Sequence, residues 1–403
     1  MKQNYFMGLI ACAALTMTGC SNDEINAPQQ SQGNSAIEFS TYLGRNAQGS
    51  RSTETNTDSI KANGFGVLAY YTDTANFSAD TNKPNFMWNQ KVTHNGANWE
   101  YTPIKYWPTK VGDKVSFFAY APYVEGGDAN GIVLSKNNAT GAPTATITLP
   151  DDPSQTIDFV AAVQMNKTHD NSASANNNVS FNLKHEMTRV KVQAKLDKSV
   201  YSDTDDKHKT FVVIKNVTFN DKGQFYKSGK YTFSTTDGER GTWTTTDNAT
   251  AYSLDLNKVM KKETIKVTGA KGSTVSGDYQ KGEDGIKLVN DTPVSLFKDD
   301  QYLFLIPVAS LTDGKATATI EYDIVTEDSK LAVGYSCTNA TKIVKLPAGT
   351  LQQGKSYNYT FIINLDEIVL DAAVEKWDET ASDSNINVPY TPDNATATTN
   401  PGA

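Results

Sequence analysis

Apolar residues recur at every second position along much of this chain, whereas helical periodicity is almost absent. In residues 37–43 the side chains of Ile37, Phe39 and Leu43 would share one face, and residues 190–196 alternate apolar side chains with Lys or Gln. Because successive side chains of an extended strand point to opposite faces, these segments are typical of strands with one buried face. Similar alternation occupies residues 357–365 and 368–374.

The spacing of these segments predicts the fold class. Many short strands separated by Gly-containing turns are typical of antiparallel β-sandwiches, so we predict an all-β protein. A short helix over residues 254–262 is the one helical element that the pattern suggests.

Residues 1–19 have the composition of an export signal. They hold one cation, Lys2, no carboxylate, and an apolar run too short to span a bilayer. The sequence Met-Thr-Gly-Cys at positions 17–20 resembles a bacterial lipobox. That resemblance implies cleavage between Gly19 and Cys20, and acylation of Cys20 with a diacylglycerol and a further fatty acid such as palmitate. The alternative is an ordinary secreted protein with a chance Cys at the cleavage site.

The residues after Cys20 predict where such a lipoprotein would reside. Asp23 and Glu24 resemble the acidic tag that directs Bacteroidetes lipoproteins to the outer face of the outer membrane. Residues 26–34 contain no aliphatic side chain larger than that of Ala, so we expect residues 20–35 to form a flexible leader. The expected location is therefore the cell surface, with the lipid in the outer membrane.

Charge and cysteine content argue against a nucleic-acid-binding protein and against a protein stabilised by intrachain disulfides. The formal net charge is −8 and no basic cluster is present, which argues against nucleic acid as a partner. Of the three cysteines, Cys12 leaves with the signal and Cys20 carries lipid, so Cys337 has no partner for an intrachain disulfide. The mature protein must therefore derive its stability from a packed core.

The sequence contains no recognisable catalytic or metal-binding motif. His185 and Glu186 lack the second His of a zinc protease helix, and the carboxylates after Asp203 lack the Gly and Glu of a calcium loop. No nucleophile motif or Gly-rich phosphate loop occurs, although the paired carboxylates of a glycosidase meet only in three dimensions. We expect a protein that is not an enzyme, with structural histidines, no cofactor and no metal site.

Four segments together carry a resemblance to a known family. Residues 99–108 read WEYTPIKYWP, and residues 114–122 read KVSFFAYAP. Residues 184–190 read KHEMTRV, and GKSYNY at 354–359 begins an alternating strand that leads to Trp377. These segments resemble the fimbrillin family of Bacteroidetes, which comprises the subunits of type V pili and related surface lipoproteins. The resemblance implies two transthyretin-like β-sandwich domains.

The polar composition of two segments suggests the domain boundaries. Residues 166–178 lack a large apolar side chain and carry five Asn, as expected of a solvated linker. We therefore predict an N-terminal sandwich over residues 36–165 and a C-terminal sandwich over residues 179–378. Residues 379–403 are mostly Thr, Asn, Ser, Asp and Pro, and should form a flexible tail or a donor strand.

The resemblance implies a structural function, namely a precursor subunit of cell-surface fimbriae that supports adhesion and has other fimbrial subunits as partners. Members of the family are matured by a protease that cuts after Arg near the first strand. Arg45 and Arg51 lie just past residues 37–43 in a polar segment, and Arg51 has the more extended polar surroundings. Cutting there would free the first strand and open a groove for a donor strand from another subunit. Ile386, Val388 and Tyr390 alternate in the tail and are the candidate donor residues.

Aromatic residues in the first half support a second hypothesis. A surface lipoprotein that does not polymerise could bind glycans through exposed aromatic side chains. Aromatic residues at strand spacing are more often core, so we predict that Trp107 and Phe118 are buried. Ser59 and Thr74 follow Asp in short motifs similar to the O-glycan acceptor of this bacterial group, and are weak candidates for modification.

Overall fold

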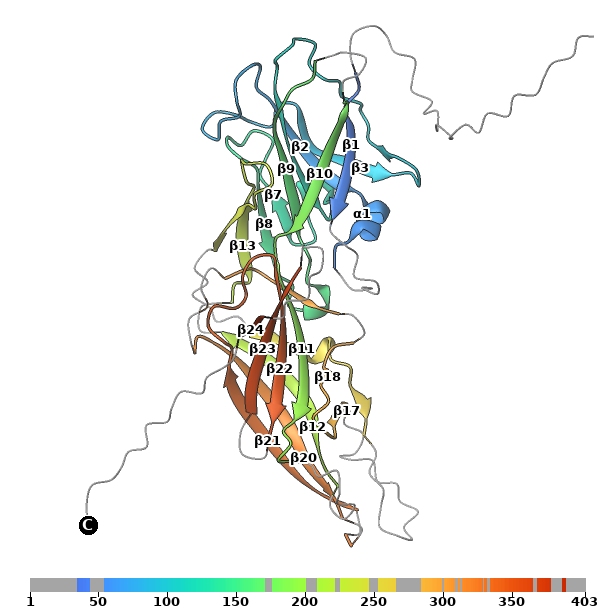
Figure 1. The fold of residues 1–403 in the computed structure, drawn as a ribbon, viewed down its shortest axis with the longest axis vertical. Helices are drawn as coiled ribbons and strands as arrows, with labels where there is room; N and C mark the ends of the chain where they lie inside the picture. Colours follow the sequence, from blue (N-terminus) through green and yellow to red (C-terminus); the bar gives the residue numbers. More distant parts are fainter. Residues whose placement is uncertain are drawn as a thin grey trace, which may run out of the picture.

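The computed structural model describes residues 35–43, 54–170, 176–200, 209–221, 225–245, 253–265, 284–298, 301–308, 311, 314–328, 330–331, 334–364, 368–377 and 386–388. Within these ranges most regular structure is β-strand, as the alternating pattern predicts. Figure 1 shows an elongated molecule with β1, β2, β9 and β10 toward one end and β12, β20 and β21 toward the other.

Two of the sheets in the described residues occupy the first of these ends. The larger contains β1 (Glu38–Leu43), β10 (Asn178–His185), β9 (Val160–Lys167), β5 (Val115–Ala121), β2 (Phe65–Tyr71), β3 (Met87–His94) and β4 (Trp99–Glu100), in that order. The smaller contains β14 (Thr242–Thr245), β13 (Ser228–Thr232), β8 (Thr144–Thr148), β7 (Ile132–Leu134) and β6 (Asp128–Ala129).

Two further sheets build the opposite end. One has the order β18 (Val294–Ser295), β11 (Thr188–Leu196), β22 (Lys355–Ile363), β23 (Ile368–Lys376) and β24 (Ile386–Val388), with β19 (Leu303–Leu305) also paired to β11. The other has the order β16 (Glu263–Thr264), β17 (Asp284–Leu288), β12 (Lys209–Asp221), β20 (Ala316–Glu327) and β21 (Tyr335–Lys345), with β15 (Ser253–Asp255) also paired to β12.

Helical structure in the described residues is short. The helix α1 (Thr57–Asn63) begins at a capping box, in which Asn56 and Ser59 each accept a hydrogen bond from the other's backbone N–H. Single 3₁₀ turns occur at η1 (Glu125–Gly127), η2 (Pro153–Gln155) and η3 (Leu256–Lys258). The helix predicted over residues 254–262 is therefore reduced to the 3₁₀ turn η3, because residues 253–255 pair with β12 instead.

The prediction of an all-β fold is confirmed, but the expectation of purely antiparallel sheets is not. Among the described residues, β1 pairs with β10 in parallel, with Phe39 opposite Val179, and β11 pairs with β22 in parallel. Parallel neighbours require a long crossover connection, and here each pair joins strands more than 100 residues apart. Alternation within a strand carries no information about the direction of its neighbour.

The chain changes sheets at positions other than those predicted. Residues 168–177 connect β9 to β10, and these two strands are paired neighbours in one sheet. The chain leaves that sheet at Glu186 and Met187, and returns to the same end of the molecule with β13, which pairs with β8. Residues 179–185 and 228–245 therefore lie with the N-terminal strands, and the division of the whole chain into two domains stays a prediction.

Both faces of the seven-stranded sheet are covered by apolar side chains. On one face, Leu68 and Phe118 belong to a large buried cluster that continues into the sheets of the opposite end. On the other face, Phe39, Phe117 and Trp107 belong to a second cluster. Phe118 is 0% exposed and Trp107 is 3% exposed, so the prediction that both are buried is confirmed.

None of the helices in the described part of the chain has the length and hydrophobicity needed to cross a membrane.

Replacing Phe118 with Ala should destabilise the protein by about 3–5 kcal/mol, because the substitution leaves a cavity in a close-packed core. Urea denaturation followed by tryptophan fluorescence measures the change in unfolding free energy. Tyr106→Ala is the matched control, since the Tyr106 side chain is 48% exposed and its removal should change stability by less than about 0.5 kcal/mol. Equal stability of the Phe118 variant and the control would contradict the assignment of Phe118 to the core.

Candidate functional site

The strand β1 lies at an edge of the seven-stranded sheet in the described residues, and β1 together with the residue before it supplies three buried side chains, those of Ile37, Phe39 and Leu43. The ring of Phe39 has its centroid 5.1 Å from that of Tyr101 and 5.9 Å from those of Phe117 and Phe181. Three aromatic neighbours thus surround one side chain of an edge strand. Without β1, these neighbours would line an apolar groove.

Hydrogen bonds hold both β1 and the residue directly before it. The parallel ladder with β10 covers Glu38 to Leu43, opposite Asn178 to Leu183. Directly before β1, the N–H of Ile37 donates to the carbonyl of Lys105 at 2.9 Å, and the Tyr101 hydroxyl donates to the carbonyl of Ile37 at 3.0 Å. The segment around Lys105 therefore fixes the point at which the chain enters β1.

Most of the predicted processing residues lie outside the described residues. Gly19, Cys20, Arg45, Arg51 and Tyr390 all belong to this group, and their predictions stay untested. The gap that contains Arg45 and Arg51 begins directly after Leu43 and ends before Glu54. The hydroxyl of Thr57 donates to the carbonyl of Leu43 at 3.2 Å, so the residues on the two sides of this gap are close in space.

Two candidate donor residues are described, and they pair within their own chain. Ile386 and Val388 belong to β24, which is antiparallel to β23. Ile386 lies opposite Val374, and Val388 lies opposite Ala372. Any transfer of this segment to another subunit would first have to separate β24 from β23.

The two candidate glycosylation residues differ in the hydrogen bonding and exposure of their hydroxyl groups. The hydroxyl of Ser59 donates to the carbonyl of Asn56 at 2.9 Å and accepts from the N–H of Asn56 at 2.8 Å, as part of the helix cap. Thr74 is exposed in the turn after β2. The geometry favours Thr74 over Ser59 as a modification site, and both stay predictions.

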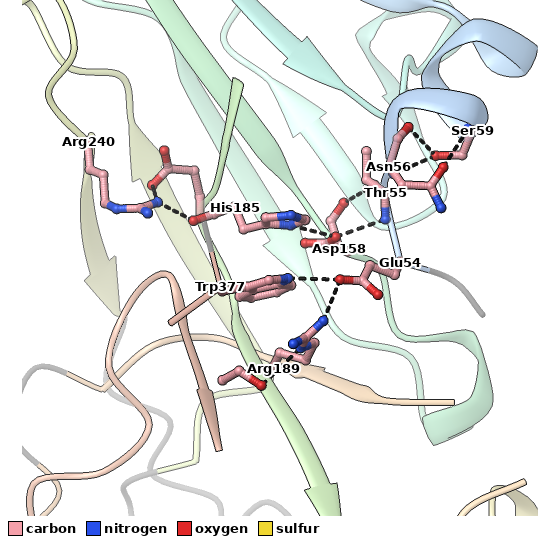
Figure 2. A network of polar contacts seen from close by, with 11 residues as sticks. Glu54, Thr55, Asn56, Ser59, Asp158, His185, Arg189, Arg240 and Trp377 are labelled. Carbon is pink, nitrogen blue, oxygen red and sulfur yellow. Dashed lines mark hydrogen bonds and ion pairs between the residues drawn. The ribbon is translucent and has the colours of Figure 1, made fainter. Parts of the chain in front are cut away.

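A network of buried polar side chains lies where the two pairs of sheets meet (Figure 2). The carboxylate of Asp158 accepts from the N–H of Thr55 at 2.8 Å and contacts Nδ1 of His185 at 2.8 Å. Burial raises the pKa of Asp158 above its ordinary value, and the neighbouring His185 opposes that rise. These contacts join the start of the α1 segment to the ends of β9 and β10.

The second part of the network centres on Glu54, whose side chain is 7% exposed. Its Oε1 atom accepts from Nη1 of Arg189 at 2.6 Å and from Nε1 of Trp377 at 2.8 Å. The indole of Trp377 stacks on His185 with a centroid separation of 4.0 Å. The guanidinium of Arg189 lies 5.0 Å from the centroid of that indole, within range of a cation–π contact. We call Glu54, Arg189 and Trp377 the junction cluster.

Glu186 forms a third part of the same region and is 1% exposed. It pairs with Arg240 at 3.7 Å and accepts from the side-chain amide of Gln353. Desolvation by burial raises the pKa of Glu186 to about 8, although the charge of Arg240 acts in the opposite direction. The side chain therefore holds its proton at neutral pH.

Glu54, Asp158 and His185 each place a potential ligand atom within 4.8 Å of the others. Arg189 already contacts Glu54, and Thr55 and His185 contact Asp158. A metal ion would have to displace these contacts beside a guanidinium charge. We therefore keep the expectation that His185 is structural.

Sequence analysis missed most of the network, because its members come from distant segments of the chain. His185, Glu186 and Arg189 lie within the KHEMTRV segment, where charged residues precede an apolar alternation. That placement was the one available signal for a buried polar site. Glu54 and Asp158 have no such signal.

The described architecture is that of a fimbrial β-sandwich protein. A crystal structure of a fimbrial protein from Bacteroides vulgatus superposes with a TM-score of 0.70 at 26% identity, covering 85% of this chain and 99% of that one. The family model described as fimbrillin-like matches residues 50–377, and the chain belongs to this family. It is also 30% identical over 401 residues to the fimbrium subunit Fim1C of Phocaeicola vulgatus, covering 94% of this chain and 98% of that relative. The resemblance inferred from sequence is confirmed.

Stability should fall as pH rises from about 4.5 to about 8, because of Glu186. In the unfolded chain the pKa of this side chain is near its ordinary value of 4.5, whereas burial in the folded protein raises that pKa to about 8. The folded state binds more protons in this window, so raising the pH favours unfolding. Urea titrations at pH 5 to 9 measure the effect.

Glu186→Gln should flatten that pH dependence, since Gln keeps the shape of the neutral acid and cannot ionise. Glu321→Gln on the exposed face of β20 is the matched control and should keep the wild-type profile. A wild-type slope in the Glu186 variant would show that other groups control the pH dependence.

Proposed function

We propose that this protein is the precursor of a cell-surface fimbrial subunit that assembles by donor-strand exchange and supports adhesion. One observation carries the proposal: β1 completes an apolar core as an edge strand of the described sheet, and a segment with two Arg residues follows it directly. A single cut in that segment would leave β1 attached by noncovalent contacts alone. Membership of the fimbrillin-like family supports this assignment.

The apolar contacts of β1 set the free energy available for assembly. Ile37, Phe39 and Leu43 are each buried, and burying a side chain of this kind contributes about 1.5–3 kcal/mol. Loss of β1 would expose Tyr101, Phe117 and Phe181 to water. A strand from another subunit that covers these rings recovers that free energy, which drives association.

The tail of the same chain is the proposed donor, through Ile386, Val388 and Tyr390. In the described residues β24 pairs with β23 through three residue pairs, which is a short ladder. A ladder of three pairs leaves little backbone pairing to break before the segment can move to another subunit. Pro389 removes one ladder hydrogen bond from the donor and so weakens its pairing. A related subunit that lacks this Pro is therefore also a suitable source of the donor strand.

Cys20 gives the precursor its proposed attachment to the outer membrane. A triacylated Cys anchors firmly, because each buried CH₂ contributes about 0.8 kcal/mol. A cut after Arg45 or Arg51 would separate the subunit from this anchor together with β1. Lipidation thus keeps the precursor at the membrane until the cut that makes it competent to assemble.

The alternative of a glycan-binding protein loses support from the burial of its aromatic residues. Trp107, Phe117 and Phe118 are all buried, so their faces are not available to sugar rings. Tyr106 remains exposed, but it is the one exposed aromatic ring among residues 99–122, which the structure describes throughout. We therefore favour the fimbrial subunit.

Assembly should fail when either the cut or the donor is removed. The double variant Arg45→Ala/Arg51→Ala should remain uncleaved and monomeric, because β1 stays covalently attached in its groove. A truncation after Trp377 should be cleaved but should not polymerise, because it lacks the donor. Electron microscopy of cells and denaturant-resistant ladders on gels measure the outcome, and normal fibres from both variants would contradict the mechanism.

Cys20→Ala should abolish lipidation and leave the precursor uncleaved by the signal peptidase or released from the membrane. Acyl burial is the proposed anchor, so the variant should move from the detergent phase to the aqueous phase in a partitioning experiment. Replacing Cys337 with Ala is the control, since this residue lies in β21, far along the chain from the signal, and should not alter partitioning. Unchanged partitioning of the Cys20 variant would argue against the lipobox.

A further inference from the structure

The junction cluster joins two places that matter for assembly and are 323 residues apart in the sequence. Glu54 is the first described residue after the segment that contains Arg45 and Arg51. Trp377 directly follows β23 and begins the connection to β24. The hydrogen bond from Nε1 of Trp377 to Oε1 of Glu54 thus links the candidate cleavage segment to the root of the tail (Figure 2).

Arg189 makes this link charged and buried. Its Nη1 donates to the same Oε1 atom of Glu54, and its Nε donates to the hydroxyl of Ser356 at 3.0 Å. The guanidinium lies 4.5 Å from the centroid of the Tyr302 ring, and the side chain is 10% exposed. A guanidinium so placed needs its carboxylate, because an unpaired buried charge is strongly unfavourable.

A second contact ties the same N-terminal segment to Trp377. The N–H of Thr55 donates to the carboxylate of Asp158, and that carboxylate contacts Nδ1 of His185. The imidazole of His185 in turn stacks on the indole of Trp377. Phe304 packs on Trp377 with a centroid separation of 5.8 Å. The position of the Trp377 side chain therefore depends on residues 54 and 55 as well as on its own neighbours.

We infer that the junction cluster is a latch that keeps the tail on β23 while the segment before Glu54 is intact, and releases it when that segment is cut. This inference rests on the proposed function and adds a coupling between maturation and donor release. The precursor would hold its donor, and the cleaved subunit would present it.

Cleavage acts on the latch through the chain end that it creates. A cut after Arg51 would leave Glu54 within a few residues of a new terminus and would remove the connection to β1. Residues near a free terminus fray, so Glu54 would leave Arg189 and Trp377 more often. Trp377 would then be free to move, and the connection between β23 and β24 would become longer, which raises the entropy lost when that loop closes.

Because β24 pairs with β23 through only three residue pairs, it is sensitive to a change in the connection that precedes it. A ladder of this length depends on how closely its connection is held. The ladder between β12 and β20 has twelve residue pairs, so we expect its stability not to depend on the cluster. Release of the latch should therefore affect β24 and leave β12 and β20 unchanged.

Hydrogen exchange monitored by mass spectrometry tests the latch on a precursor that begins at Ser21 and therefore lacks both the signal and the lipidated Cys. Glu54→Gln and Trp377→Phe each remove part of the cluster and retain its shape. Both should raise exchange at residues 386–388 about tenfold or more, the factor expected for loss of a charge-assisted hydrogen bond. Exchange in β12 and β20 should not change, which separates release of the tail from general destabilisation.

Asp152→Asn is the matched control. Asp152 also pairs with a distant cation, Lys258 at 2.9 Å, and its other side-chain hydrogen bonds are with Ser154, outside the junction cluster. Its variant should show wild-type exchange at residues 386–388. The wild-type precursor cut by an arginine-specific protease, with the site verified by intact mass, should match the Glu54 variant.

Different experimental outcomes would contradict the latch and the proposed function. Unchanged exchange of the tail in both cluster variants, or in the cut wild-type protein, would overturn the latch whether or not fibres form. A cut precursor that shows fast exchange of the tail but does not polymerise would support the latch and contradict assembly through that tail. Faster exchange in β12 and β20 to the same degree would show that the cluster is a general stabilising element, and would also overturn the latch.

Discussion

The packing of Phe39 among Tyr101, Phe117 and Phe181 is the interaction on which the N-terminal half depends. It completes a core on the face of the seven-stranded sheet opposite to Phe118. An edge strand that supplies a central core residue is a weak point, because exposed edges readily pair with other chains. The proposed exchange of β1 for a strand from another subunit would use this weakness, because a strand with the same apolar pattern would fill the same groove.

Buried polar groups at the junction of the sheets have a different role. The carboxyl groups of Glu54, Asp158 and Glu186 are all removed from water, which is unfavourable unless each group keeps hydrogen-bonding partners. The partners of Glu54, Asp158 and Glu186 come from distant segments, so these contacts favour one arrangement of the two ends of the molecule.

How far the sequence predicts this structure depends on the range of each interaction. Alternation at Ile37, Phe39 and Leu43 correctly indicated a strand and its buried face, because both are properties of a few consecutive residues. The parallel direction of β1 could not be predicted in this way, since it is set by β10, about 140 residues later. The contact of Glu54 with Trp377 could not be predicted either, because the two residues are 323 positions apart and neither has an unusual sequence context.

The direction of β1 has a consequence for the position of the cleavage segment. β10 runs toward His185 at the junction, and β1 is parallel to it, with Leu43 opposite Leu183. The chain therefore leaves β1 at the end of the sheet where Glu54, Arg189 and Trp377 meet. An antiparallel first strand would end at the far side of the sheet, away from the root of the tail. Parallel pairing thus brings the candidate cleavage segment and the root of the candidate donor to one place, which the proposed coupling between them requires.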